Sequence, residues 1–193
     1  LLAGQLALAL VRAKVRRTAG RALTGDGSLE RLIRSALSYS LTDSQEQALK
    51  EIHADLESPD RMLRLLQGDV GAGKTVVALL AMARAAEAGG QSALMAPTEI
   101  LARQHFATIE PLARKAGLST AVLTGREKGR ERAKILEAVA SGEIDILLGT
   151  HALFQESVVF RDLALAIVDE QHRFGSTASS STRGHKRPAR ITR

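Results

Sequence analysis

Eight consecutive residues, from Gly68 to Thr75, read Gly-Asp-Val-Gly-Ala-Gly-Lys-Thr and match the pattern G-x-x-x-x-G-K-[ST] in full. Glycines let such a phosphate-binding loop (P-loop) curl so that successive backbone N–H groups point at phosphate oxygens, and the helix that follows adds its positive end. Lys74 would reach the β- and γ-phosphates, and the Thr75 hydroxyl would ligate Mg²⁺. The pattern predicts a nucleoside triphosphate site with the binding residues Gly68, Val70, Gly71, Ala72, Gly73, Lys74 and Thr75.

A second acidic group is needed to hold the metal ion of such a site. The apolar run from Leu163 to Val168 ends in the carboxylates of Asp169 and Glu170. Asp169 would hold Mg²⁺, directly or through water, and Glu170 would orient and polarise the attacking water. The alternative is a solvated acidic pair that simply ends a strand. The P-loop favours the catalytic interpretation, because both carboxylates would lie at the same sheet edge as Lys74.

The strands and helices that position these residues can be predicted from the sequence, in which short apolar runs alternate with longer amphipathic stretches. The predicted strands are Met62 to Leu66, Ser92 to Ala96, Thr120 to Leu123, Ile144 to Leu148 and Leu163 to Val168, and the predicted helices are Gly73 to Glu87, Thr98 to Ala116 and Gly129 to Ala140. Strands separated by helices indicate right-handed crossovers. We therefore expect an α/β fold of the P-loop NTPase class, a parallel sheet with helices on both faces and ligands beyond the carboxyl ends of its strands.

Four separate motifs, in order, carry a resemblance to a known family. The stretch Leu65 to Thr75 is similar to motif I of the RecG family of superfamily 2 helicases, Ala93 to Ala102 to its motif Ia, Gly149 to Leu153 to its motif Ib, and Asp169 to Gly175 to its motif II. The resemblance runs from about Leu1 to Gly175. The transcription-repair coupling factor shares much of this pattern, but it typically has a glutamate where this chain has Gln171, which favours RecG.

The resemblance implies a RecA-like lobe that uses ATP and Mg²⁺, and it implies further site residues. Gln45 resembles the glutamine that reads adenine ahead of motif I. Thr42 and Gln45 also form a capping-box pattern, so Gln45 could close a helix end, and the two roles are compatible.

Residues that follow three of the predicted strands would, by the same resemblance, face the DNA backbone. They are Pro97, Thr98 and Glu99, then Thr124 and Gly125 with the basic Arg126 and Lys128, and finally Thr150 and His151. Hydroxyls and N–H groups at helix starts suit phosphate oxygens without reading sequence. The alternatives are a helix N-cap for Thr98 and an ordinary turn residue for His151.

Amino-acid composition and net charge limit the functions that the chain could have. Hydrophobic residues make up 45% and charged residues 25% of the chain, which are values of a globular protein. There is no cysteine, which excludes disulfides, a thiolate metal site and a cysteine nucleophile. The net charge is +6, but five of the 27 basic residues lie in the last 18 residues, leaving 22 basic against 21 acidic residues. Bulk charge is therefore weak evidence for a nucleic-acid partner.

We expect three zones along the chain. Residues 1–40 are predicted to be a helical segment, a linker from a preceding wedge domain, broken by a turn at Thr24 to Gly27. Residues 41–175 are predicted to form an incomplete first RecA-like lobe. Residues 176–193, rich in Ser, Thr, Arg and Pro, are predicted to be a disordered basic tail that departs from the family.

The leading functional hypothesis is a RecG-type ATP-dependent helicase or translocase that remodels branched DNA, such as replication forks and Holliday junctions, in repair and recombination. The expected partners are branched or duplex DNA and the absent second lobe and wedge domain. The expected setting is a monomer in the bacterial cytoplasm with no membrane segment.

Other hypotheses remain. One is that this piece only binds nucleotide and DNA, because a second lobe supplies the arginine finger needed for turnover. Another is a different superfamily 2 translocase such as the transcription-repair coupling factor. A P-loop small-molecule kinase is disfavoured, because the sequence offers no candidate acceptor pocket.

Overall fold

The computed structural model of the protein describes residues 20–69, 71–169 and 189–192. Its elements, in chain order, are α2 (Ser28–Ala36), α3 (Asp43–Glu57), β1 (Leu63–Leu65), α4 (Lys74–Glu87), β2 (Gln91–Met95), α5 (Glu99–Lys115), β3 (Thr120–Leu123), α6 (Gly129–Ser141), β4 (Ile146–Gly149), the 3₁₀ helix η1 (His151–Phe154), β5 (Leu163–Val168) and β6 (Ala189–Thr192). Among the described residues, no helix has the length and apolar character needed to cross a membrane.

The strands form one sheet in the order β1-β6-β5-β2-β4-β3, and every pair of neighbours is parallel. Side chains of β2 and β4 are buried along the whole strand, as are those of β5 after its first residue. Burial on both faces is what a parallel sheet requires when helices cover each side. The predicted fold class is confirmed.

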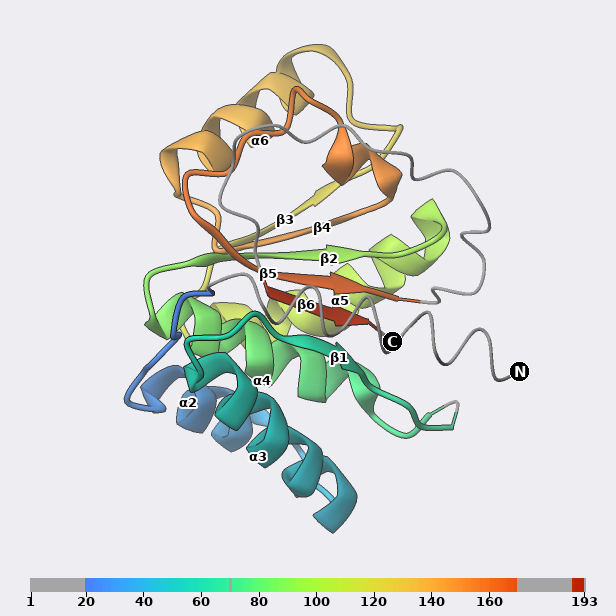
Figure 1. The fold of residues 1–193 in the computed structure, drawn as a ribbon. Coiled ribbons are helices and arrows are strands. Elements are labelled where there is room, and N and C mark those ends of the chain that lie inside the picture. The colour runs from blue at the N-terminus through green and yellow to red at the C-terminus, as the bar shows by residue number, and fades with distance from the viewer. Residues whose placement is uncertain (1–19, 70, 170–188, 193) are drawn as a thin grey trace, which may run out of the picture.

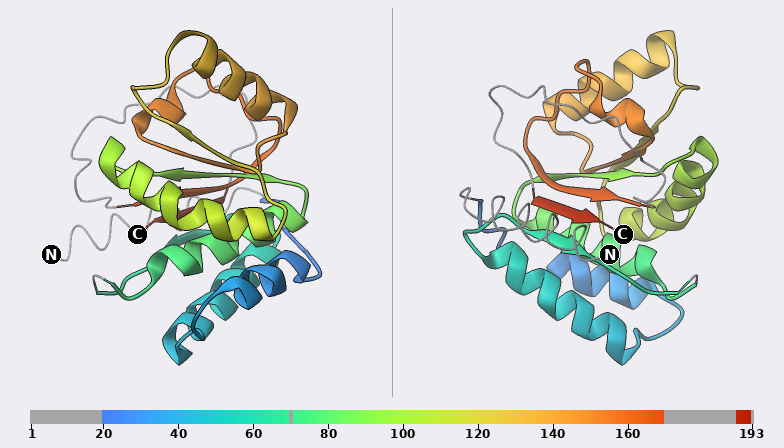
Figure 2. Two further views of the ribbon diagram at one scale, coloured as in Figure 1. Left: turned by 180° about the vertical axis from the view of Figure 1, so that it is seen from behind. Right: turned by 45° about the vertical axis from the view of Figure 1, so that its right-hand side comes forward.

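Helices lie on both faces of the sheet (Figure 1). Helix α4 is buried continuously from Val76 to Ala83, because the sheet covers one side and α2 and α3 cover the other. Helix α6 and η1 cover the opposite face, over β3 and β4 (Figure 2). Two hydrophobic clusters result. The larger, which includes Leu94, Ile146 and Leu165, lies beneath α2–α5, and the smaller, which includes Leu147 and Val139, lies beneath α6.

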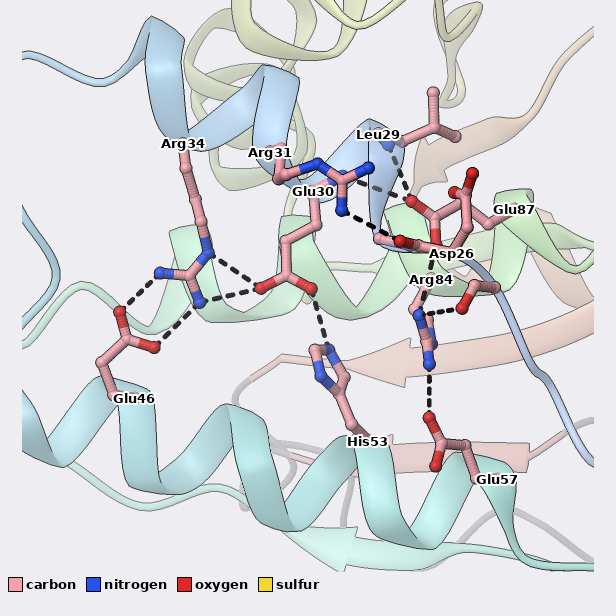
Figure 3. A network of polar contacts seen from close by, with 12 residues as sticks. Asp26, Leu29, Glu30, Arg31, Arg34, Glu46, His53, Glu57, Arg84 and Glu87 are labelled. Carbon is pink, nitrogen blue, oxygen red and sulfur yellow. Dashed lines mark hydrogen bonds and ion pairs between the residues drawn. The ribbon is translucent and has the colours of Figure 1, made fainter.

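A buried carboxylate joins α2 to the rest of the lobe (Figure 3). Gly27 caps α2 without a side chain, so the N–H groups of the first turn need another acceptor. The Glu87 carboxylate, whose side chain is only 3% exposed, accepts from the N–H groups of Gly27 at 3.0 Å and Leu29 at 2.7 Å. Arg84 pairs with Glu87 and also donates to the Gly25 carbonyl oxygen at 2.6 Å. Helix α2 is therefore fixed to α4 by charge as well as by its buried Ile33.

The element predictions hold closely, with one difference near the end of the chain. Residues 176–193 are expected to be disordered, but Ala189–Thr192 form β6, which pairs with β1 on one side and β5 on the other. A strand between β1 and β5 hydrogen-bonds the edges of both, which would otherwise be unpaired. Amino-acid composition alone does not reveal this gain in hydrogen bonding. Residues 176–188 and 193 lie outside the described residues. So do residues 1–19 of the predicted helical segment, and the three-zone division stays a prediction.

Candidate nucleotide and DNA sites

The P-loop curls around its own lysine. Gly71 and Gly73 adopt positive φ angles of 84° and 73°, a conformation that other residues rarely take. Helix α4 begins at once with Lys74, whose Nζ donates to the carbonyl oxygens of Gly68 at 2.6 Å and Asp69 at 2.8 Å. The ammonium group and the first N–H groups of α4 thus lie at one loop, which is the donor set that a polyphosphate needs. Val70 lies outside the described residues.

Gln45 joins the start of α3 to the P-loop. Its Oε1 accepts from the Thr42 N–H at 2.9 Å, and its own N–H donates to the Thr42 hydroxyl at 3.3 Å, which completes a capping box. Its Nε2 donates to the Ala72 carbonyl oxygen at 2.9 Å. The helix-capping interpretation is confirmed, and the adenine-reading role stays a prediction. A side chain at Gly73 would collide with this amide, because an added Cβ would lie 2.2 Å from Gln45 Nε2.

Asp169 follows β5 and is 6% exposed. Its N–H donates to the Met95 carbonyl oxygen at 2.8 Å, and its Oδ2 lies 2.6 Å from Nε2 of His105 on α5. Both the P-loop and Asp169 lie at the carboxyl edge of the parallel sheet, as predicted. A hydroxyl and a carboxylate are hard oxygen ligands of the kind that Mg²⁺ prefers, so Thr75 and Asp169 fit that ion. Glu170 lies outside the described residues.

The described residues contain no group of three or more His, Cys, Asp or Glu side chains arranged for a metal ion. His105 was not predicted as a site residue. It is 64 residues from Asp169, and no local spacing marks the contact.

A hollow of about 440 Å³ lies beyond the carboxyl ends of β2, β3 and β4. Of the nine residues predicted to face DNA, seven line it, and Arg126 and Lys128 do not: the seven are Pro97, Thr98, Glu99, Thr124, Gly125, Thr150 and His151. Arg132 and Gln155 complete the wall on the side of α6 and η1. Three loops far apart in sequence therefore meet in one place, because β2, β4 and β3 are neighbours in the sheet. We call this space the strand-end hollow.

Several of these residues already have partners within the protein. The Thr98 hydroxyl accepts from the Leu101 N–H at 3.2 Å, so the N-cap interpretation of Thr98 is confirmed. Thr124 is fully buried, and its hydroxyl and N–H both donate to Glu127, at 2.8 and 2.6 Å. Thr150 is also buried, whereas His151 is exposed at the start of η1. Whether each residue contacts DNA stays a prediction.

Two carboxylates connect α5 and the loop that follows β3. Glu99 accepts from the Gly125 N–H at 2.8 Å and from Arg126 Nε at 3.2 Å. Glu127, which is 6% exposed, pairs with Arg103. Burial by itself would raise the pKa of Glu127, but the hydrogen bonds from Thr124 and Arg103 outweigh burial and hold that pKa below its usual value. Glu127 is therefore a charged anchor of the loop.

The chain matches the model of the DEAD/DEAH box helicase family over residues 42–187 and belongs to that family. The predicted enzyme class, an ATP-dependent helicase and hence a hydrolase, is thereby confirmed at the level of the family. Helicases of this class share the RecA-like fold described above. A structure of a hypothetical ATP-dependent RNA helicase from Sulfolobus tokodaii, 18% identical with a TM-score of 0.59, covers 86% of this chain and 50% of its own length, which supports the fold alone.

Within that family the chain is similar to RecG. The ATP-dependent DNA helicase RecG of Bacillus subtilis is 55% identical over 147 residues, or 76% of this chain and 21% of that protein. RecG of Escherichia coli K12 is 44% identical over 175 residues, or 91% of this chain and 25% of that protein. A structure of RecG bound to a three-way DNA junction is 40% identical, with a TM-score of 0.85 over 97% of this chain and 25% of its own length. The predicted resemblance to RecG is confirmed, and the chain spans about a quarter or less of these proteins.

Proposed function

We propose that this chain is the first motor lobe of a RecG-type, ATP-dependent translocase that acts on branched DNA, in repair and recombination in the bacterial cytoplasm. One observation carries the proposal. The P-loop, Asp169 and the strand-end hollow all lie along the carboxyl edge of one parallel sheet. A motor lobe needs its nucleotide site and its DNA site on one rigid body. A movement of the lobe that is driven at the nucleotide site then also moves the bound DNA.

In the nucleotide half-site, Lys74 binds the β- and γ-phosphates and the N–H groups of the P-loop cradle them. Thr75 and Asp169 would hold Mg²⁺, and the bound ion would supply charge neutralisation at the γ-phosphate. Glu170 orients the attacking water and accepts its proton. Gln45 would read adenine with its Nε2, after that group gives up its hydrogen bond to the Ala72 carbonyl oxygen, while its Oε1 continues to cap α3.

In the strand-end hollow, the protein binds the DNA backbone rather than base edges. The hollow is lined by threonines, the Gly125 backbone and Arg132, together with the carboxylates of Glu99 and Glu127. Hydroxyls, N–H groups and an arginine position a phosphate chain without selecting a sequence. The relative solved with a three-way junction makes branched DNA the leading partner class. The wedge domain and the second lobe of the RecG-type parent would select the branch point.

For these 193 residues by themselves, we propose binding of Mg·ATP and DNA with little turnover. An arginine finger that neutralises charge on the γ-phosphate is worth several orders of magnitude in related hydrolases. In the proposed parent it comes from the second lobe. A small-molecule kinase receives no support, since the hollow is open, polar and remote from the P-loop lysine in sequence and sheet position.

Hydrolysis of Mg·ATP by the purified chain tests the proposal, with and without a three-way DNA junction and with Lys74→Ala as the control. We expect nucleotide binding that depends on Lys74 and at most slow turnover. Turnover that is rapid, stimulated by DNA and abolished by Lys74→Ala would contradict the requirement for a second lobe. Absence of nucleotide binding by a folded sample would contradict the function itself.

A further inference from the structure

The strand-end hollow contains a negative charge in a place that suits a phosphate. Glu99 accepts from the Gly125 N–H at 2.8 Å and from Arg126 Nε at 3.2 Å. A backbone N–H beside a guanidinium is a donor pair that binds any oxyanion, carboxylate or phosphate alike. The pair lies on the loop after β3 that also lines the hollow.

We propose that Glu99 is an internal competitor for DNA, and that its carboxylate occupies the donors of Gly125 and Arg126 until a backbone phosphate displaces it. This inference rests on the proposed DNA role of the hollow and assigns Glu99 the opposite of an attractive contact. Glu99 limits the affinity of the lobe for DNA, and removing its charge strengthens binding.

The space around Gly125 is shaped for an anion. A Cβ added at Gly125 would lie 2.8 Å from Glu99 Oε1, closer than a carbon can approach. A side chain at position 125 would therefore force the Glu99 carboxylate, the end of a flexible side chain, to shift away from this N–H. The same space would admit a phosphate oxygen once the carboxylate has turned away.

The loop does not depend on Glu99 for its shape. Glu127 holds it from within, through both donors of the buried Thr124, and ties it to α5 through an ion pair with Arg103. Glu127 is buried and charged, which makes it the structural anchor. Glu99, at the start of α5, is thus a second carboxylate that contacts an already anchored loop, and its charge lowers the affinity of that loop for DNA.

Displacement of Glu99 is inexpensive. The side chains of Arg126 and Glu99 are 67% and 35% exposed, and exposed ion pairs contribute little to stability. Arg132, across the hollow, donates to the neutral oxygens of Gln155 and Ser157. A DNA phosphate would thus be attracted by two arginines and opposed by two carboxylates, Glu99 and Glu127, both of which line the hollow. Weak binding of this kind suits a motor that must release and rebind DNA in every cycle of ATP hydrolysis.

Fluorescence anisotropy with a labelled three-way junction tests the inference, using the 193-residue chain at about 50 mM salt. We expect Glu99→Gln to lower the dissociation constant about 3- to 10-fold, as for loss of one like charge near a phosphate, and the gain to shrink at higher salt. Glu99→Ala should tighten binding at least as much. Glu137→Gln, an exposed glutamate on α6, is the matched control for net charge.

The outcomes separate this inference from the proposed function. Arg126→Gln should weaken binding if the hollow is a DNA site at all. Suppose that Arg126→Gln weakens DNA binding. If Glu99→Gln then also weakens it, or gives the same affinity as Glu137→Gln, Glu99 supports the loop or contacts DNA directly, and the inference is wrong. If neither variant changes the affinity, the DNA role of the hollow fails as well. Thermal melting of each variant establishes that it is folded.

Discussion

The P-loop and the strand-end hollow lie along the same sheet edge but are built in different ways. The P-loop takes its shape from its own backbone, with glycines at φ angles of 84° and 73° and a lysine that bonds back to the carbonyl oxygens of Gly68 and Asp69. The hollow is assembled from three loops, and carboxylates from α5 and the loop after β3 determine its shape and charge.

This difference affects how each site can change when its ligand binds. In the P-loop, the Lys74 ammonium group already lies within the loop and only has to exchange carbonyl oxygens for phosphate oxygens. In the hollow, polar groups are paired with one another, so binding must break internal contacts first. Binding free energy is reduced by what those contacts contribute. We therefore expect the nucleotide site to depend on single residues and the hollow to depend on a balance of charges.

The largest expected effect is at Lys74. Lys74→Ala removes a charge-assisted contact to phosphate worth about 2–3 kcal/mol, so nucleotide affinity should fall roughly 30- to 100-fold. Titration with a fluorescent ATP analogue and Mg²⁺ measures this change. Lys115→Ala, at the exposed end of α5, is the control and should have no effect. An equal loss in both variants would show that bulk charge, and not the P-loop, binds the nucleotide.

The anchor of the hollow should matter next. Glu127→Gln replaces one acceptor oxygen with an amide that faces the donors of Thr124 or Arg103, at a cost of about 2 kcal/mol, or roughly 4–8 °C in melting temperature. Glu99→Gln should change stability by less than about 0.5 kcal/mol. Thermal unfolding of both variants compares the two carboxylates. Equal destabilisation would contradict the distinction between anchor and competitor.

A pair of glycines tests the local construction of the P-loop. Gly73 and Gly89 have similar φ angles of 73° and 76°, so alanine at either position carries the strain of a left-handed backbone, about 1 kcal/mol. An added Cβ at Gly73 would also collide with Gln45, whereas at Gly89 it meets nothing within 4 Å. The Gln45 amide ends a flexible side chain and can turn away, so Gly73→Ala should be less stable than Gly89→Ala by about 1 kcal/mol in urea unfolding, from the lost hydrogen bond to Ala72. Only Gly73→Ala should also weaken nucleotide binding.

The smallest expected effect is on the pH dependence of stability. The folded-state pKa of Glu127 lies below the ordinary 4.5, so its charge stabilises the fold above about pH 4.5, and that stabilisation is lost as pH falls through the folded pKa. The stability gap between the wild-type chain and Glu127→Gln should shrink as the pH falls from 6 towards 3. Urea unfolding at several pH values measures it. A gap that is constant over this range would mean that Glu127 does not act through its charge.

Contiguous patterns made the fold predictable, whereas contacts between distant residues did not. The strands Thr120–Leu123 and Leu163–Val168 have the predicted bounds, because apolar runs between polar breaks mark buried strands. The P-loop is a single run of eight residues. Its geometry follows from its glycines.

The partners of the site residues could not be predicted in the same way. Glu99 lies 26 residues from Gly125, and His105 lies 64 residues from Asp169, so each pair meets only through the order of the strands. That Thr98 caps α5 was foreseeable from its position before a helix. The Thr124–Glu127 pair has the same Thr-x-x-Glu spacing as a capping box, but it closes a loop ahead of α6 and not the start of that helix.

Hydrogen exchange of the chain, with Mg·ATP analogue or with a three-way junction, tests the central claim that two separate sites lie on one sheet edge. The account predicts that nucleotide protects amides of the P-loop and of α4's first turn, while DNA protects amides of the three loops around Thr98, Gly125 and Thr150. Protection of the P-loop by DNA alone, or of none of the three loops by DNA, would contradict it.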